Sequence, residues 1–257
     1  MKIANFKASS YSSLKVFKPI QYLTIDGCAH NQQIANVKLR VRVVNSETGR
    51  VDEIIPMITL DVLGEIASMN EGFFILADNR ADNQLYFRIN VMLHPTSAIY
   101  LSNDKYLEID IEGLDSEVAT TIYGIEKPVI DKEFICRYNK FYMSAGELQK
   151  TFAVGENENL VLPYLSFEEV TIHYKNGSSC TYTTTELSAM MMMQNDIVSV
   201  PLLHEHSSNF AAYPYWANVY GHSKMYGLDV SDAVDFTIRR ESSTTAFELI
   251  MIDTLKD

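Results

Sequence analysis

The residues best suited to chemistry are two alternating histidines, His204 and His206, separated by a single glutamate. Side chains two positions apart on a strand project to the same side, so this pair could bind a metal ion with His222 as a third ligand. The segment, however, opens a loop rich in serine and asparagine. Two histidines without a positioned third ligand form a weak metal motif, and we interpret them as solvated loop residues.

A run of methionines and two oxygen-rich segments could also provide ligands for a metal ion. Residues 190–193 are four consecutive methionines, which cover every face of a helix and so cannot all bind one copper ion. We interpret them as flexible packing next to a neighbouring subunit. Residues 78–83 and 229–232 are rich in side-chain oxygens, but neither matches the EF-hand loop, and we interpret both as charged turns. Binding of a divalent cation such as calcium is not excluded, but the sequence identifies no set of ligands for it.

Recognisable catalytic motifs are missing from the sequence. It contains no GxSxG, GxGxxG, HExxH or Walker loop, and only 11 of its 257 residues are glycine. Triads assemble from distant positions, so the absence of a motif lowers the prior for an enzyme without excluding one. We therefore expect a protein that is not an enzyme and that has no cofactor or metal centre.

Composition narrows the class of protein further. Apolar residues make up 47% of the chain, enough for a substantial core, and the formal net charge of −12 argues against direct sequence-specific nucleic-acid binding. Cys28, Cys136 and Cys180 form no CxxC pair, which is typical of free, mostly buried thiols in a reducing compartment. No signal peptide and no apolar run of 18 residues is present, so we expect synthesis in a cytoplasm and no membrane span.

The beginning of the chain has the opposite charge from the rest. Residues 1–25 contain Lys2, Lys7, Lys15 and Lys18 and no acidic residue. One interpretation is an ordinary solvated terminal segment. The other is an arm that lies on an anionic surface, such as a layer of lipid headgroups.

The elements that must position these residues begin with a short helix that recurs. Residues 59–70 (TLDVLGEIASMN) start with threonine and an early acidic residue, which favour a helix N-terminus, and carry an apolar stripe at helical spacing. Residues 184–195 (TTELSAMMMMQN) have the same form about half a chain later. Each helix is flanked by strand-like runs, which indicates a duplicated β-domain.

The strands recur in the same order as the helices. Residues 37–44 (VKLRVRVV) alternate strictly, which predicts a half-buried strand with Lys38, Arg40 and Arg42 on a wet outer face. In residues 106–111 (YLEIDI) we expect Glu108 and Asp110 to point outward in the same way. The matched segments are 37–44 with 169–174, 72–77 with 197–203, 106–111 with 234–238, and 118–125 with 247–252. Turns are predicted at Asp26-Gly27 and Asn176-Gly177.

These patterns predict an all-β chain of two tandem eight-stranded jelly rolls, each with a short inserted helix. We place an N-terminal arm at 1–13, the first jelly roll at 14–129 and the second at 149–257. Residues 130–148 hold four aromatic residues and are predicted to be a packed, partly helical connector.

The order of elements resembles one family, the double jelly-roll major capsid proteins of tailless, membrane-containing icosahedral bacteriophages of the corticovirus and tectivirus type. The resemblance rests on VKLRVRVV with TLDVLGEIASMN in the first half and on EVTIHYKNG with TTELSAMMMMQN in the second. It also rests on the closing pairs YLEIDI with VATTIYGI and VDFTI with FELIMI.

The resemblance implies a structural function. Three chains would form a homotrimer with a six-fold-like outline, which tiles an icosahedral shell beside neighbouring capsomers and a vertex (penton) protein. It also implies that the arm with Lys2, Lys7, Lys15 and Lys18 faces an internal lipid membrane. The protein would then be made in the host cytoplasm and located in the virion.

Two alternatives remain at this point. Tyr213, Tyr215 and Trp216 form an aromatic loop that could stack on sugars, as expected of a tandem β-sandwich carbohydrate-binding or adhesin protein. The same loop could instead be a packed corner or a trimer contact, because aromatic residues are enriched at interfaces. A bicupin enzyme would need a histidine metal triad within one barrel, which the six histidines do not form.

Overall fold

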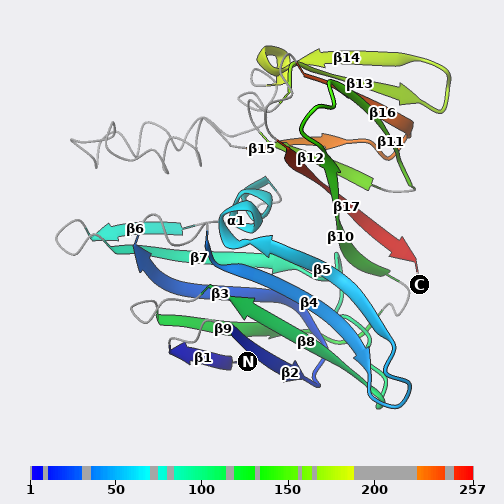
Figure 1. The fold of residues 1–257 in the computed structure, drawn as a ribbon. Helices are drawn as coiled ribbons and strands as arrows, with labels where there is room; N and C mark the ends of the chain where they lie inside the picture. Colours follow the sequence, from blue (N-terminus) through cyan, green and yellow to red (C-terminus); the bar gives the residue numbers. More distant parts are fainter. Residues whose placement is uncertain are drawn as a thin grey trace. The chain divides into compact units, whose positions relative to one another are not determined.

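In the computed structural model the chain divides into two compact units, one formed by Met1–Asn139 with Thr254–Asp257 and the other by Lys140–Asp253 (Figure 1). The structure describes residues 2–7, 11–30, 36–69, 75–79, 84–113, 119–130, 134–155, 158–163, 167–187, 225–240 and 246–256.

Nine of the described strands and one helix lie wholly within the first unit. They are β1 (Lys2–Lys7), β2 (Tyr11–Val16), β3 (Ile20–His30), β4 (Lys38–Asn45), β5 (Val51–Thr59), α1 (Leu60–Met69), β6 (Ile75–Asn79), β7 (Gln84–Met92), β8 (Lys105–Glu112) and β9 (Ala119–Glu126). The strands form two sheets with the orders β1-β9-β3-β7-β6 and β2-β8-β4-β5. All of their pairings are antiparallel. Two sheets that exchange strands in this way form a jelly roll, with β6 added at one edge.

The second set of strands repeats this wiring. It consists of β10 (Phe134–Met143), β11 (Gln149–Ala153), β12 (Glu158–Pro163), β13 (Glu169–Tyr174), β14 (Ser179–Thr183), β15 (Met225–Asp229), β16 (Ala233–Arg239) and β17 (Phe247–Lys256). Their sheets have the orders β10-β17-β12-β15 and β11-β16-β13-β14. Apart from the additional strand β6, each strand in the two sheets of the first unit has a counterpart at the same place in the strand order of this second set. The predicted all-β class with two jelly rolls is therefore confirmed.

Helix α1 lies between β5 and β6, where the sequence predicts it. Leu60, Leu63, Ile66 and Ala67, which form the predicted apolar stripe, are all buried. The Leu60 N–H donates to the carbonyl of Val37 at 2.8 Å, which ties the start of the helix to the strand region before β4. Burial of each large aliphatic side chain contributes about 1.5–3 kcal/mol, so packing holds this short helix in place.

The second predicted helix begins after β14, and its described part covers residues 184–187. Its cap is Thr183 rather than Thr184, because the Thr183 hydroxyl accepts from the N–H of Glu186 at 3.3 Å. The Glu186 carboxylate accepts in return from the Thr183 N–H at 2.8 Å. This capping box satisfies two donors at the helix start and lowers the pKa of Glu186.

The predicted turn at Asp26-Gly27 is wrong, because both residues lie inside β3. Asp26 pairs with Arg88 of β7 and with Thr121 of β9. The Arg88 guanidinium donates to the Asp26 carboxylate at 2.6 and 2.7 Å. Pairing on both sides of a central strand outweighs the local turn preference of an Asp-Gly pair.

The structure also departs from the predicted segments at two places. Residues assigned to the arm form β1, which pairs with β9, and the start of β2, which pairs with β8. The predicted boundary at residue 13 therefore falls within a strand. The connector 130–148 contains β10, a strand where a partly helical segment is expected, because its aromatic and branched side chains suit a sheet.

Candidate functional surface

A ladder of charged side chains crosses the sheet β2-β8-β4-β5 of the first unit, and its members come from β4 and β8. In the register of these strands Lys38 faces Glu112, Arg40 faces Asp110, and Arg42 faces Glu108. Leu39, Val41 and Val43 alternate with the basic residues and are buried in the core. The ladder therefore occupies the opposite side of the sheet, which we call the first outer face.

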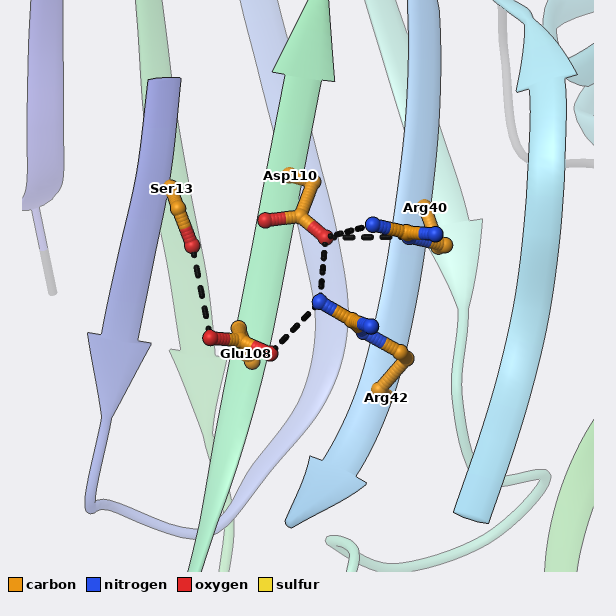
Figure 2. Close-up of polar contacts among 5 residues, drawn as sticks. All are labelled: Ser13, Arg40, Arg42, Glu108 and Asp110. Atoms are coloured by element: carbon orange, nitrogen blue, oxygen red, sulfur yellow. Dashed lines mark hydrogen bonds and ion pairs between the residues drawn. The ribbon is translucent and has the colours of Figure 1, made fainter. Parts of the chain in front are cut away.

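Asp110 is the centre of the ladder (Figure 2). Its Oδ2 accepts from Arg40 Nε at 3.0 Å and Nη2 at 2.8 Å, and from Arg42 Nη2 at 2.8 Å. Arg42 Nη2 also donates to Glu108 Oε2 at 2.6 Å. Two guanidinium groups thus share two carboxylates, and charge-assisted hydrogen bonds of this length are stronger than neutral ones.

The expectation of a wholly wet outer face is wrong for this ladder. The side chain of Asp110 is 0% exposed, and those of Arg40 and Arg42 are only 27% and 22% exposed. The long arginine side chains reach across to the carboxylate and shield it from water. A buried carboxylate needs such partners, so the cluster fixes how β4 and β8 align.

The other end of the first outer face is aromatic. Phe17 is 67% exposed, and its ring centroid lies 5.5 Å from that of Tyr106. Lys15 Nζ lies 4.7 Å from the centroid of the Tyr106 ring, which is a cation–π arrangement. Val51, the residue opposite Val44 in the β4–β5 register, is also exposed. Apolar side chains exposed next to a charged ladder are available for contact with another protein surface.

The structure separates the four predicted arm lysines. Lys15 lies on the first outer face, whereas Lys18 Nζ pairs with Glu126 at 3.3 Å, with both side chains largely exposed. Lys2 and Lys7 are the terminal residues of β1. The sequence therefore identifies the basic segment but not strand β1, which contains Lys2 and Lys7.

Several other predicted residues lie outside the described residues. These are the aromatic loop residues Tyr213, Tyr215 and Trp216, the histidines His204, His206 and His222, and the methionines 190–193. Of the oxygen-rich loops, Asp229 accepts from the N–H of Ser231 at 2.9 Å, which lowers the pKa of Asp229 and closes a turn. Within the described ranges, no group of three or more His, Cys, Asp or Glu side chains is arranged to hold a metal ion.

The thiols differ from each other in exposure. Cys136 on β10 is a buried thiol, as predicted, but Cys180 on β14 is exposed. In the part of the chain that the structure describes, no helix is both long enough and apolar enough to cross a membrane.

The corresponding sheet of the second unit, β11-β16-β13-β14, presents a different set of side chains. Glu169, Thr171 and His173 on β13 face Arg239, Thr237 and Asp235 on β16. Arg239 pairs with Glu169 at 2.9 Å, and His173 Nδ1 lies 2.5 Å from Asp235 Oδ1. A row of threonines, one on each strand, crosses this sheet: Thr151, Thr237, Thr171 and Thr181. The two units thus share a scaffold but differ in their outer faces.

Sequence reasoning missed a pair of buried carboxylates in the second unit. Glu158 on β12 faces Asp253 on β17, and the two residues are 6% and 5% exposed. Burial raises the pKa of Glu158, the N–H of Gly155 at 2.6 Å lowers it, and the charge of Asp253 raises it. The net effect is a raised pKa. Glu158 and Asp253 are each two positions away from a core residue, Leu160 and Met251 respectively, and therefore point to the same side of their strands. The alternation in the sequence could have revealed their burial.

Comparison with known proteins gives a likeness to a solved structure. No family model matches the sequence, and no curated protein matches it either. The structure, however, is similar to the crystal structure of the major capsid protein P2 from bacteriophage PM2. The likeness covers 98% of this chain and 94% of the other, with a TM-score of 0.50 and 11% identity. The resemblance inferred from the sequence, to double jelly-roll capsid proteins, is confirmed at the level of the fold.

We predict that Asp110→Ala destabilises the first unit by about 2–3 kcal/mol. The change leaves Arg40 and Arg42 without their shared acceptor, and the loss is below the roughly 3–5 kcal/mol of a fully buried pair because both arginines are partly exposed. Glu112→Ala is the matched control on the same strand. Its partner Lys38 lies 3.7 Å away with both side chains over 40% exposed, so we expect a loss of only about 0–1 kcal/mol. Equal losses in urea unfolding would contradict the central role of Asp110.

We predict that Glu158→Gln stabilises the protein at pH 7 and that this gain shrinks as the pH falls towards 4. Because the pKa of Glu158 is raised in the folded state, the folded protein binds this proton more tightly than the unfolded chain does, and protonation of Glu158 stabilises the fold. The neutral amide of glutamine resembles the protonated carboxyl group at every pH. Glu147→Gln is a control of opposite sign, because the Ser144 N–H lowers the pKa of Glu147 and favours its charged form. Thermal unfolding across this pH range measures both, and a destabilising Glu158→Gln at pH 7 would show the account of this pair to be wrong.

Proposed function

We propose that this protein is a major capsid protein, with a structural rather than an enzymatic role. The observation that carries the proposal is the double jelly roll itself, which matches that of a phage major capsid protein over 98% of the chain. A fold alone does not define a function. Here the duplicated wiring adds a specific argument from symmetry.

Two units with the same strand order in one chain suit a shell built from trimers that have a nearly six-fold outline. Three chains around an axis bring together six jelly rolls, so a trimer presents a nearly hexagonal block. Such blocks fill flat facets with repeated contacts. The unlike outer faces of the two units would then alternate around the ring, so each contact would join two different surfaces.

The exposed apolar side chains provide material for contacts between copies. Phe17 and Val51 belong to the first outer face, and Tyr142, Leu148 and Val234 lie in the second unit. Each has at least half of its surface exposed. Burial of such residues between subunits would contribute favourable free energy that the single chain does not use.

The remaining parts of the proposal concern partners and location. Neighbouring capsomers and a vertex protein would complete the shell, and the protein would be made in a host cytoplasm and end in the virion. Lys2, Lys7, Lys15 and Lys18 would face the anionic headgroups of an internal membrane, each contributing on the order of 1 kcal/mol. β1 pairs with β9 and β2 pairs with β8, and both are edge strands of their sheets. The contact with the membrane would therefore come from the edge of the jelly roll.

We predict that the purified protein forms trimers of three times 29.2 kDa, or larger shells built from them. Contacts between exposed apolar residues and between unlike units favour a closed ring over the single chain. Mass photometry over a range of concentrations measures the species present, and circular dichroism confirms that the sample is folded. A folded monomer at every concentration would contradict the proposed function.

A further inference from the structure

The hairpin between β13 and β14 contains Asn176-Gly177, the one Asn-Gly pair in the sequence. Its residues from Lys175 to Ser178 are exposed. Gly177 has a φ of +83°, and a Cβ built at this position would meet nothing within 4 Å. The turn is therefore open to water, and its backbone has room to change.

The side-chain amide of Asn176 is held by two donors. Its Oδ1 accepts from the N–H of Ser178 at 2.9 Å and from the Ser178 hydroxyl at 2.6 Å. The N–H donor identifies the accepting atom as the amide oxygen. Two donors on one carbonyl oxygen stabilise the negative charge that develops when a nucleophile attacks the carbon.

A nucleophile is available in the next residue of the chain. The backbone nitrogen of Gly177 follows Asn176 directly, and glycine has no side chain to hinder its approach to Cγ. In the folded turn the Gly177 N–H donates to the carbonyl of Tyr174 at 2.9 Å. Attack therefore requires the opening of this single hydrogen bond in an exposed turn.

From this geometry we propose that Asn176 is a site of spontaneous deamidation, which Ser178 promotes. The Gly177 nitrogen gives its proton to water and forms a bond to Cγ of Asn176. The Cγ–Nδ2 bond then breaks, and the nitrogen takes a proton from water and leaves as ammonia, giving a cyclic imide. A second water molecule opens the imide to aspartate or isoaspartate, so only water is consumed.

The modification would change the surface while the core stays intact. It adds one negative charge beside Lys175, whose Nζ donates to the carbonyl of Ser231 at 3.0 Å. The isoaspartate product also lengthens the backbone of the turn by one carbon. The turn joins the edge strand β14 to β13, so the change lies at the end of their hairpin, outside the paired residues Glu169–His173 and Ser179–Thr183. The inference is independent of whether the protein builds a shell.

The test is to incubate the purified full-length protein at mildly alkaline pH and to cleave it at glutamate. Cleavage after Glu169 and Glu186 gives a peptide with Asn176 inside it, which mass spectrometry can follow for amide-to-acid conversion and for isoaspartate. We expect this peptide to convert before any other asparagine-containing peptide. No conversion at Asn176 would overturn the proposal.

The contribution of Ser178 is tested with two neighbouring serines. Ser178→Ala removes the hydroxyl donor and should slow the conversion severalfold, while Ser179→Ala leaves the contacts of Asn176 intact and should keep the original rate. In urea the two variants should convert at the same rate, because the turn is lost. Equal rates in the folded variants, or a faster Ser178→Ala, would overturn the role of Ser178.

Discussion

The first unit depends on the register between β4 and β8. In this register Leu39, Val41 and Val43 enter the core, while Arg40 and Arg42 meet Asp110 and Glu108 on the other side. A slip of one residue would place the arginines in the core and the aliphatic side chains outside. The buried carboxylate of Asp110 adds a second penalty, since a slip would remove both of its guanidinium partners. Hydrophobic burial and charge pairing therefore select the same alignment.

The same scaffold occurs twice, but only its inner side is repeated. Both units bury aliphatic and aromatic side chains at matching strand positions, because the jelly-roll wiring requires a filled space between two sheets. The outer faces differ: β4 and β8 pair Arg40 with Asp110, whereas the corresponding strands β13 and β16 pair Thr171 with Thr237. A chain whose two units share a fold but differ in their outer surfaces can make distinct contacts around a ring of three chains. This is the physical basis of the proposed role in a shell.

The sequence predicts the parts of this fold that depend on periodicity. Strict alternation identifies β4, β8 and β13, and the apolar stripe identifies α1, because in each case one side is buried and the other is not. It fails where tertiary pairing overrides a local preference, as at Asp26-Gly27 inside β3. It also fails at β10, whose aromatic side chains favour a strand over the expected partly helical connector. Strand β15 is missed because Met225–Asp229 contains a glycine and no alternation. The burial of Asp110 could not be predicted, since it depends on how two arginines lie over a neighbouring strand.

In the proposed function this double jelly roll is a building block of a shell. The most direct measurement is electron cryo-microscopy of particles purified from cells that express the full chain. The account predicts closed or sheet-like lattices whose repeating block holds six jelly rolls from three chains. Well-folded particles without any lattice, or a block with another number of chains, would contradict it.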